Sequence, residues 1–140
     1  MNPFADFMAD NAELIPNEKF VATSRFKNKK TGQPLEWEIR AISSDENEEL
    51  QRASMTTVSV SRGNNRREID GLKYVYKLVA ASIVSPDLNN AELQDSYKVK
   101  TPEALLKKML YPSEFDALAN KVMDMTGIQD LGELVKEAKN

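Results

Sequence analysis

The sequence predicts an α+β fold in which an N-terminal β-hairpin packs with a mainly helical C-terminal part. Apolar and polar residues alternate between residues 19 and 42, as in strands with one buried face. From Ser43 onward, apolar residues recur every three or four positions, as they do along helices. A chain of 140 residues is long enough to bury one core. We therefore expect a single domain over residues 1–140, divided into an N-terminal arm or short helix (1–18), the hairpin (19–42) and the mainly helical part (43–140).

The first residues form a candidate short helix. Pro3 suits the first helical position, where a backbone N–H is not needed, and Asn2 can cap it. Phe4, Phe7 and Met8 would then share one face. A helix of about two turns is marginal alone in water. It therefore needs a surface to lie on, which is either the protein's own core, an oligomer neighbour or a binding partner.

The hairpin is predicted from alternation on both sides of a glycine turn. The segment Lys19–Phe26 alternates, Thr31-Gly32 supplies turn residues, and Leu35–Ala41 alternates again. Trp37 is the only tryptophan of the chain. We expect it on the buried face of the sheet, with stacking on a ligand as the alternative.

Local signals mark the next two helices. Ser43 and Glu46 have the spacing of a capping box. Asp70 is placed to cap a central helix that is apolar on nearly every side and extends to Ile83. Between these helices the pattern weakens, and residues 56–67 are predicted to form a short strand and a flexible loop.

Three more helices are expected in the last third of the chain. Thr101, followed by proline and glutamate, opens the first. Ser113 starts the second, and Gly127 stands where a C′ residue belongs. The third follows Asp130 and carries one apolar stripe, made of Leu131, Leu134 and Val135.

Residue composition argues against catalysis. The chain contains neither histidine nor cysteine, so it lacks the usual base at neutral pH, the usual transition-metal ligands and any thiolate nucleophile. Aspartate, glutamate, lysine and tyrosine remain as alternative catalytic groups, but we expect no catalytic residues, no metal site, no cofactor and no small-molecule substrate. No apolar run approaches the length of a membrane span. A net charge of −3 weighs against nucleic-acid binding, and a cytoplasmic protein fits best.

The polar stretch Ser85–Val99 can be compared with a cation loop. An EF-hand loop beginning at Asp87 would need glycine at its sixth position, where Glu92 stands, and glutamate at its twelfth, where Lys98 stands. Glu92 and Asp95 also make a poor catalytic pair, because they are neighbours on one helical turn with no basic partner beside them. We therefore expect this stretch to have a structural role, and neither a cation-binding nor a catalytic one.

The structural reading of this stretch is specific. Pro86 is predicted to end the central helix, and Asp87 or Asn89 to cap a short turn of helix. Three apolar residues would hold that turn to the core, namely Leu88, Leu93 and Tyr97.

The most basic part of the chain extends from Arg62 to Lys77. It contains five basic residues without helix-turn-helix spacing, namely Arg62, Arg66, Arg67, Lys73 and Lys77. A small regulatory or nucleic-acid-binding adaptor that uses this patch is the alternative function.

Four segments resemble one known family, in matching order along nearly the whole chain. They read FADFMADNA near the start, LEWEIRAISSDENEEL at Leu35–Leu50, PDLNNAELQDSYKV at Pro86–Val99 and EALLKKML at Glu103–Leu110. These segments are similar to the XkdN-like phage tail assembly chaperones of phages and prophages of Gram-positive bacteria. Two positions depart from the family pattern: Lys98 stands where glycine is common, and residues 113–115 read Ser-Glu-Phe in place of Gly-Glu-Tyr.

The resemblance implies a non-enzymatic protein that binds the tape measure protein and keeps it soluble while the tail tube assembles. The tail tube protein and a second copy of the chain are further candidate partners. Such a protein would act in the cytoplasm of the bacterial host and be absent from the mature virion. A holding protein needs exposed apolar surface for a helical client. The candidate residues lie near the chain ends, with Met125 in the methionine-bearing segment 122–125: Phe4, Phe7, Met8, Met125, Leu131, Leu134 and Val135.

Overall fold

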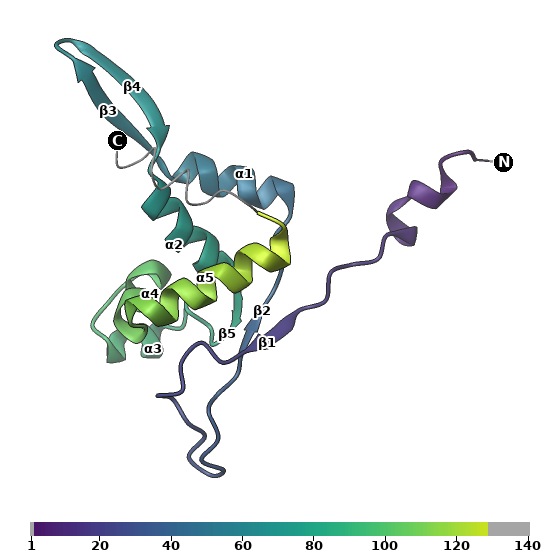
Figure 1. The fold of residues 1–140 in the computed structure, drawn as a ribbon, viewed down its shortest axis with the longest axis vertical. Coiled ribbons are helices and arrows are strands. Elements are labelled where there is room, and N and C mark those ends of the chain that lie inside the picture. Colours follow the sequence, from purple (N-terminus) through teal and green to yellow (C-terminus); the bar gives the residue numbers. More distant parts are fainter. Residues whose placement is uncertain (1, 129–140) are drawn as a thin grey trace.

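The computed structural model describes residues 2–128 and confirms the α+β fold, with strands mostly in the N-terminal half (Figure 1). Helix α2 is central and contacts α1, α4, α5 and strand β5. The helices are α1 (Ser44–Ala53), α2 (Gly71–Ser82), α3 (Ala91–Ser96), α4 (Pro102–Met109) and α5 (Pro112–Thr126). The strands are β1 (Glu18–Phe20), β2 (Trp37–Ile39), β3 (Met55–Ser61), β4 (Asn64–Ile69) and β5 (Ile83–Ser85).

The main sheet has three short antiparallel strands in the order β1-β2-β5. Phe20 of β1 pairs with Trp37 of β2, and Ile39 of β2 pairs with Ile83 of β5. The predicted hairpin of residues 19–42 is therefore present, but it is one part of a larger sheet.

The first strand of this hairpin is shorter than predicted. Two consecutive residues beyond β1, Ala22 and Thr23, are both buried, which the alternation of a strand with one buried face does not allow. Next to them, Arg25 Nη2 donates to Glu114 Oε1 over 2.9 Å, which ties this segment to α5. The path after β1 is set by contacts with helices and not by the strand ladder.

Strand β5 replaces the predicted end of the central helix. Helix α2 stops at Ser82, whose carbonyl accepts a hydrogen bond from the Arg40 N–H over 2.9 Å, and Ile83 then pairs with β2. β-Branched residues such as Ile83 pack well on a pleated sheet. The expectation that Pro86 ends the helix was therefore wrong, because Pro86 follows a strand.

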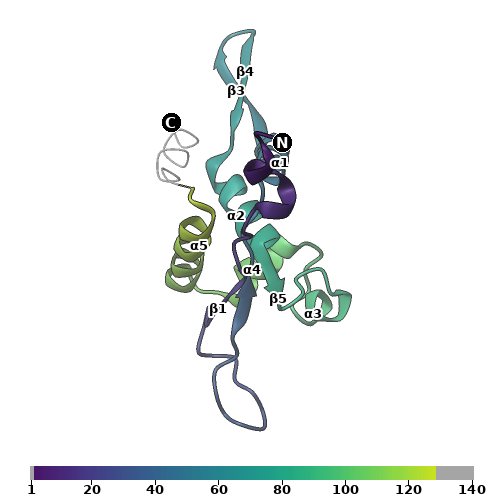
Figure 2. The ribbon, with the colours of Figure 1, turned by 90° about the vertical axis from the view of Figure 1, so that its right-hand side faces the viewer.

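Residues 56–67, predicted as a short strand and a loop, form most of a second β-hairpin. Strands β3 and β4 pair from Met55–Ile69 to Ser61–Asn64 around Gly63, whose φ of +81° is a left-handed conformation that suits glycine. Figures 1 and 2 show this hairpin projecting from one end of the molecule, opposite the loop that joins β1 to β2. The second strand was hard to predict because asparagine and charged residues dominate it.

The capping signals were read correctly. Ser43 accepts a hydrogen bond from the Glu46 N–H over 3.2 Å, and the Glu46 carboxylate accepts one from the Ser43 N–H. Asp70 and Thr101 cap α2 and α4 in the same way. Gly127 ends α5 with a φ of +74°. These contacts satisfy N–H and C=O groups that have no partner inside the helix.

Helix α5 begins one residue before the predicted start at Ser113. Pro112 occupies its first position, where the fixed φ of proline is favourable. Glu114 accepts a hydrogen bond from the Tyr111 N–H over 2.8 Å and so closes the first turn.

The polar stretch before α4 is structural, as predicted. Asn90 caps α3 by accepting from the Leu93 N–H over 2.9 Å, one residue later than expected, while Asp87 accepts from the Asn89 N–H over 3.0 Å. Leu88 is 2% exposed. Leu93 and Tyr97 are partly buried against the core. These apolar residues therefore hold the stretch to the core, as the sequence indicated.

Lys98, which stands where the resembling family commonly has glycine, ends this stretch in a left-handed conformation with a φ of +59°. Its N–H reaches the Asp95 carbonyl over 3.0 Å, and the Val99 N–H reaches the Gln94 carbonyl over 3.1 Å. The backbone here needs the geometry that glycine adopts without steric cost.

The core lies between the main sheet and helices α2, α4 and α5. Trp37 is 2% exposed, which confirms that it faces the core. The most deeply buried apolar side chains come from the sheet and from these three helices: Ile39, Tyr74, Leu78, Val79, Leu105, Leu106, Leu118 and Val122. Among residues 2–128, no helix has both the length and the apolar character that crossing a membrane requires.

Candidate functional site

An open groove lies along α2, where this helix meets α4 and α5. Its volume is about 560 Å³. The rings of Tyr76 and Phe115 stack on its floor with centroids 4.2 Å apart, and Leu72 at its edge is 53% exposed. Four more apolar residues line it, namely Val75, Leu110, Pro112 and Ala119. The groove therefore offers an apolar floor that solvent can reach.

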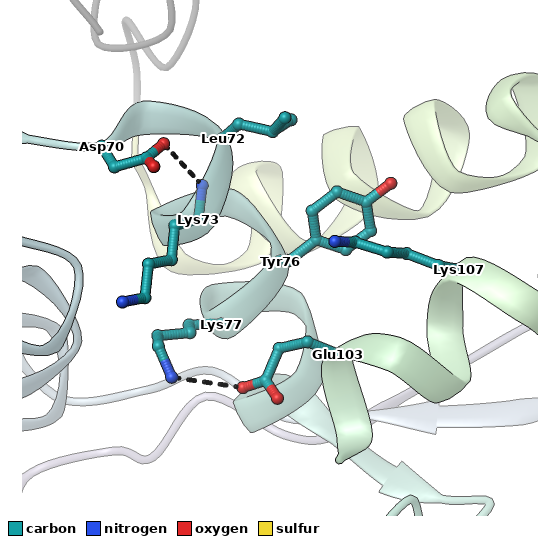
Figure 3. Close-up of a pocket in the computed structure, with 7 residues that line it drawn as sticks. All are labelled: Asp70, Leu72, Lys73, Tyr76, Lys77, Glu103 and Lys107. Atoms are coloured by element: carbon teal, nitrogen blue, oxygen red, sulfur yellow. Dashed lines mark hydrogen bonds and ion pairs between the residues drawn. The ribbon is translucent and has the colours of Figure 1, made fainter. Parts of the chain in front are cut away.

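A smaller hollow of about 270 Å³ adjoins this groove and shares Leu72, Tyr76 and Lys107 with it (Figure 3). Lys73 and Lys77 of α2 and Lys107 of α4 give the smaller hollow a basic lining. We call the two hollows together the α2 groove.

Both acidic residues of the smaller hollow already interact with residues of α2. Asp70 accepts a hydrogen bond from the Lys73 N–H over 3.1 Å, and Glu103 Oε1 lies 3.5 Å from Lys77 Nζ (Figure 3). Within residues 2–128, the side chains of Lys73 and Lys107 form no ion pair. These two ammonium groups are therefore available to an acidic ligand.

The two sides of the α2 groove differ in charge. On the α4 side, Lys107 Nζ lies 4.8 Å from the centroid of the Tyr76 ring, a cation–π contact. On the α5 side stand Asp116 and Asn120. Burial, and to a lesser extent Asp116, raises the pKa of Tyr76, so its hydroxyl stays protonated and able to donate.

The N-terminal arm, residues 2–17, is the most exposed apolar segment. It contains two short 3₁₀ turns, Ala5–Phe7 and Ala9–Asn11, in place of the predicted helix. Phe4 is 65% exposed and Phe7 is 85% exposed, and Met8, Leu14 and Ile15 are exposed as well. Figure 1 shows the arm leaving β1 and extending away from the body. The protein's own core does not receive this apolar face.

The other predicted partner-binding residues have different positions. Met125 is 8% exposed and belongs to the hydrophobic core, so its side chain is not part of an exposed surface. The remaining three lie outside the described residues, namely Leu131, Leu134 and Val135.

Sequence reasoning missed two parts of the exposed apolar surface. Leu14 and Ile15 stand before Pro16 with no helical or strand period, although an apolar pair beside a proline is itself a signal. The α2 groove joins residues from three helices, so no linear pattern marks it. Its one hint was that the helix after Asp70 is apolar on nearly every side.

In the part of the chain that the structure describes, no three or more carboxylates gather so that they could hold a metal ion. Glu92 and Asp95 are both exposed on α3. Glu46 instead pairs with Arg40, whose hydrogen bonds lower the pKa of the Glu46 carboxyl to about 2.

The basic patch between Arg62 and Lys77 is divided among several elements. Arg62 lies in the turn between β3 and β4, and Lys77 lies on α2. Arg66 and Arg67 are consecutive in β4, so their side chains leave opposite faces of the hairpin. The five basic residues therefore do not form one continuous face.

Comparison with known proteins agrees with this architecture. Residues 4–139 match the family described as the phage XkdN-like tail assembly chaperone protein. The chain is similar to the phage-like element PBSX protein XkdN of Bacillus subtilis (strain 168), with 26% identity over 87% of this chain and 83% of the relative. It is also similar to protein YqbN of the same strain, with 26% identity over 94% of this chain and 85% of the relative.

The crystal structure of protein YqbN has the same fold. It superposes with a TM-score of 0.77 and 21% identity, covering 92% of this chain and 99% of that chain. The family match spans nearly the whole described core and the N-terminal arm. The chain therefore belongs to the phage XkdN-like tail assembly chaperone family.

Proposed function

We propose that this protein binds a helical segment of the tape measure protein and keeps that client soluble while the tail tube assembles. Membership of the tail assembly chaperone family carries the proposal. That family points to a protein partner and to a non-enzymatic role. The same proposal places the protein in the cytoplasm of the bacterial host and outside the mature virion, with the tail tube protein as a second candidate partner.

The exposed apolar surface supports this function physically. Large apolar side chains on a monomer cost solubility unless they serve a contact, and the N-terminal arm and the α2 groove both present them. Methionine at position 8 adds a flexible, polarizable contact of the kind that adapts to different clients. Binding of this kind should show a negative heat-capacity change and persist at high salt. The divided basic patch offers no comparable support for a nucleic-acid adaptor.

Co-expression with a tape measure gene from the same genome, followed by a pull-down at low and high salt, tests the proposal. The wild type should keep the tape measure chain soluble and co-purify with it at both salt concentrations. Phe7→Asp should weaken the complex, because it places a charge on the exposed arm. Val60→Asp, the same change at an exposed residue of the β3–β4 hairpin, is the matched control. Trp37 fluorescence reports whether the main sheet stays folded.

Leu134→Asp extends the test to the predicted apolar stripe near the C-terminus, and it should also weaken the complex. A tape measure chain that is equally soluble with and without this protein, and that never co-purifies with it, would overturn the proposal. Binding that disappears steeply with salt would favour a charge-driven adaptor instead.

A further inference from the structure

The N-terminal arm and the α2 groove have complementary chemistry. The arm contains three acids, Asp6, Asp10 and Glu13, and its first basic neighbour in the sequence is Lys19 beyond its end. Its exposed apolar side chains alternate with these acids. The groove has an apolar floor edged by lysines, two of which lack an acidic partner within residues 2–128. An acidic apolar segment and a basic apolar groove therefore occur in the same chain.

The sizes also agree. The larger hollow of about 560 Å³ compares with the roughly 150 Å³ of a cavity that holds one benzene ring, so it has room for more than one aromatic side chain. Phe4 and Phe7 are the two most exposed aromatic side chains of the arm. Seating them over Leu72 and beside the stacked pair of Tyr76 and Phe115 would cover apolar surface on both partners.

Charge indicates the orientation of the arm in the groove. Lys73 and Lys107 lie toward α2 and α4, whereas Asp116 lies on α5. Asp6 and Asp10 would therefore face the lysines and stay away from the α5 side. Charges at the rim of an interface add steering and register more than affinity, which the apolar contacts supply.

We propose that the N-terminal arm of one copy docks into the α2 groove of a second copy. The arm extends away from its own body, so it is presented to a neighbour (Figure 1). Its fourteen residues before Pro16 can span up to roughly 45 Å when extended, enough to reach across an interface. Because the arm and the groove are different surfaces, two copies that exchange arms form two such contacts and close a dimer, whereas copies that pass their arms head to tail leave one arm and one groove open for the next copy. The inference goes beyond client binding and is tested without any client.

A charge-exchange experiment tests the proposal. One variant carries Asp6→Lys and Asp10→Lys in the arm, and the other carries Lys73→Glu and Lys107→Glu in the groove. Each alone should self-associate roughly tenfold more weakly than the wild type, the scale expected for two rim charge pairs. Mixed together, they should associate again, because the basic arm of the first variant fits the acidic groove of the second, and the acidic arm of the second fits the unchanged basic groove of the first. Sedimentation velocity over a concentration series measures all of these associations.

Two controls keep the outcome clear. Lys29→Glu with Lys30→Glu changes the net charge as the groove variant does, but in the exposed loop between β1 and β2, and should leave self-association unchanged. A labelled synthetic peptide of residues 2–15, titrated into the full chain, should bind the wild type and bind the groove variant more weakly.

Each contrary result is decisive. A wild type that stays monomeric at every concentration and does not bind the peptide overturns the proposal. A monomeric wild type that does bind the peptide shows that the groove accepts the arm sequence without pairing two copies, which also overturns the proposal. Self-association that the groove variant retains in full, or that mixing fails to restore, excludes the groove as the docking site. Co-purification of the tape measure protein is measured separately in the pull-down, so the proposed function can fail while self-association stands, and the reverse.

Discussion

Replacing Lys98 by glycine should stabilise the protein. Lys98 closes α3 with a φ of +59°, and two backbone hydrogen bonds around it fix that conformation. A residue with a Cβ atom in the left-handed conformation costs about 1–2 kcal/mol. Glycine avoids this cost but loses about 0.5–1 kcal/mol more backbone entropy on folding. The difference predicts an increase of about 0.5–1 kcal/mol in the free energy of unfolding.

Urea unfolding and thermal melts measure this effect. For a chain of this size, the gain should raise the melting temperature by about 1–4 °C. Lys98→Ala is the matched control, because it removes the long side chain but keeps the Cβ atom, and it should not stabilise. A glycine variant that melts at or below the parent would refute the reasoning. An alanine variant that gains as much as glycine would show that the lysine side chain, and not the backbone conformation, is responsible.

Two further predictions concern the core and the acid limit of stability. Trp37→Ala should lower the free energy of unfolding by roughly 3–5 kcal/mol, because it empties a core position. The control variants Glu92→Gln and Asp95→Asn, on the exposed face of α3, should each change it by less than about 0.5 kcal/mol. An unchanged urea midpoint for Trp37→Ala would contradict the place of Trp37 in the core. The hydrogen bond from Arg25 lowers the pKa of Glu114 to about 2 from a usual value of 4.5. Its contribution to stability is therefore fully present above pH 4.5 and is lost as the pH falls toward 2. In the Arg25→Gln variant, the melting temperature should fall less between pH 4.5 and pH 2 than it does in the parent. An equal fall in both proteins would show that the pairing of Arg25 with Glu114 does not contribute to stability.

Salt dependence separates the two kinds of contact proposed for this protein. Client binding through apolar surface should persist at high salt, because burial of apolar area does not depend on ionic strength. Docking of the arm in the α2 groove also buries apolar surface, but its acids and lysines lie at the rim and are screened. Self-association should therefore weaken with salt more than client binding does, which sedimentation and pull-down experiments can compare directly.

Local signals in the sequence were sufficient for the starts of α1, α2 and α4 and for the end of α5. The capping box of Ser43 and Glu46, the caps at Asp70 and Thr101, and the glycine at 127 all act within one turn, so neighbouring residues contain the whole signal. The α+β class followed in the same way, from the change of period near residue 43.

Elements that depend on distant partners were read less well. Ile83 continued an apolar helical pattern, yet it forms β5, because the open edge of β2 offers hydrogen bonds that the sequence around Ile83 does not reveal. The segment after β1 does not continue as the predicted strand, because Arg25 forms a hydrogen bond with Glu114, a residue far along the chain. Short apolar runs are compatible with more than one element, and the neighbour decides between them.

The sequence by itself determined the fold class, the family resemblance and the absence of the residues that most enzymes use. These properties depend on composition and on patterns within short windows, and the amino-acid sequence contains both in full. Only the tertiary structure decided which apolar side chains are exposed. It placed Met125 in the core, left Phe4 and Phe7 outside it, and joined Tyr76 and Phe115 in the α2 groove. Burial is a property of the space between elements, and residues that meet there are separated in the sequence by whole helices.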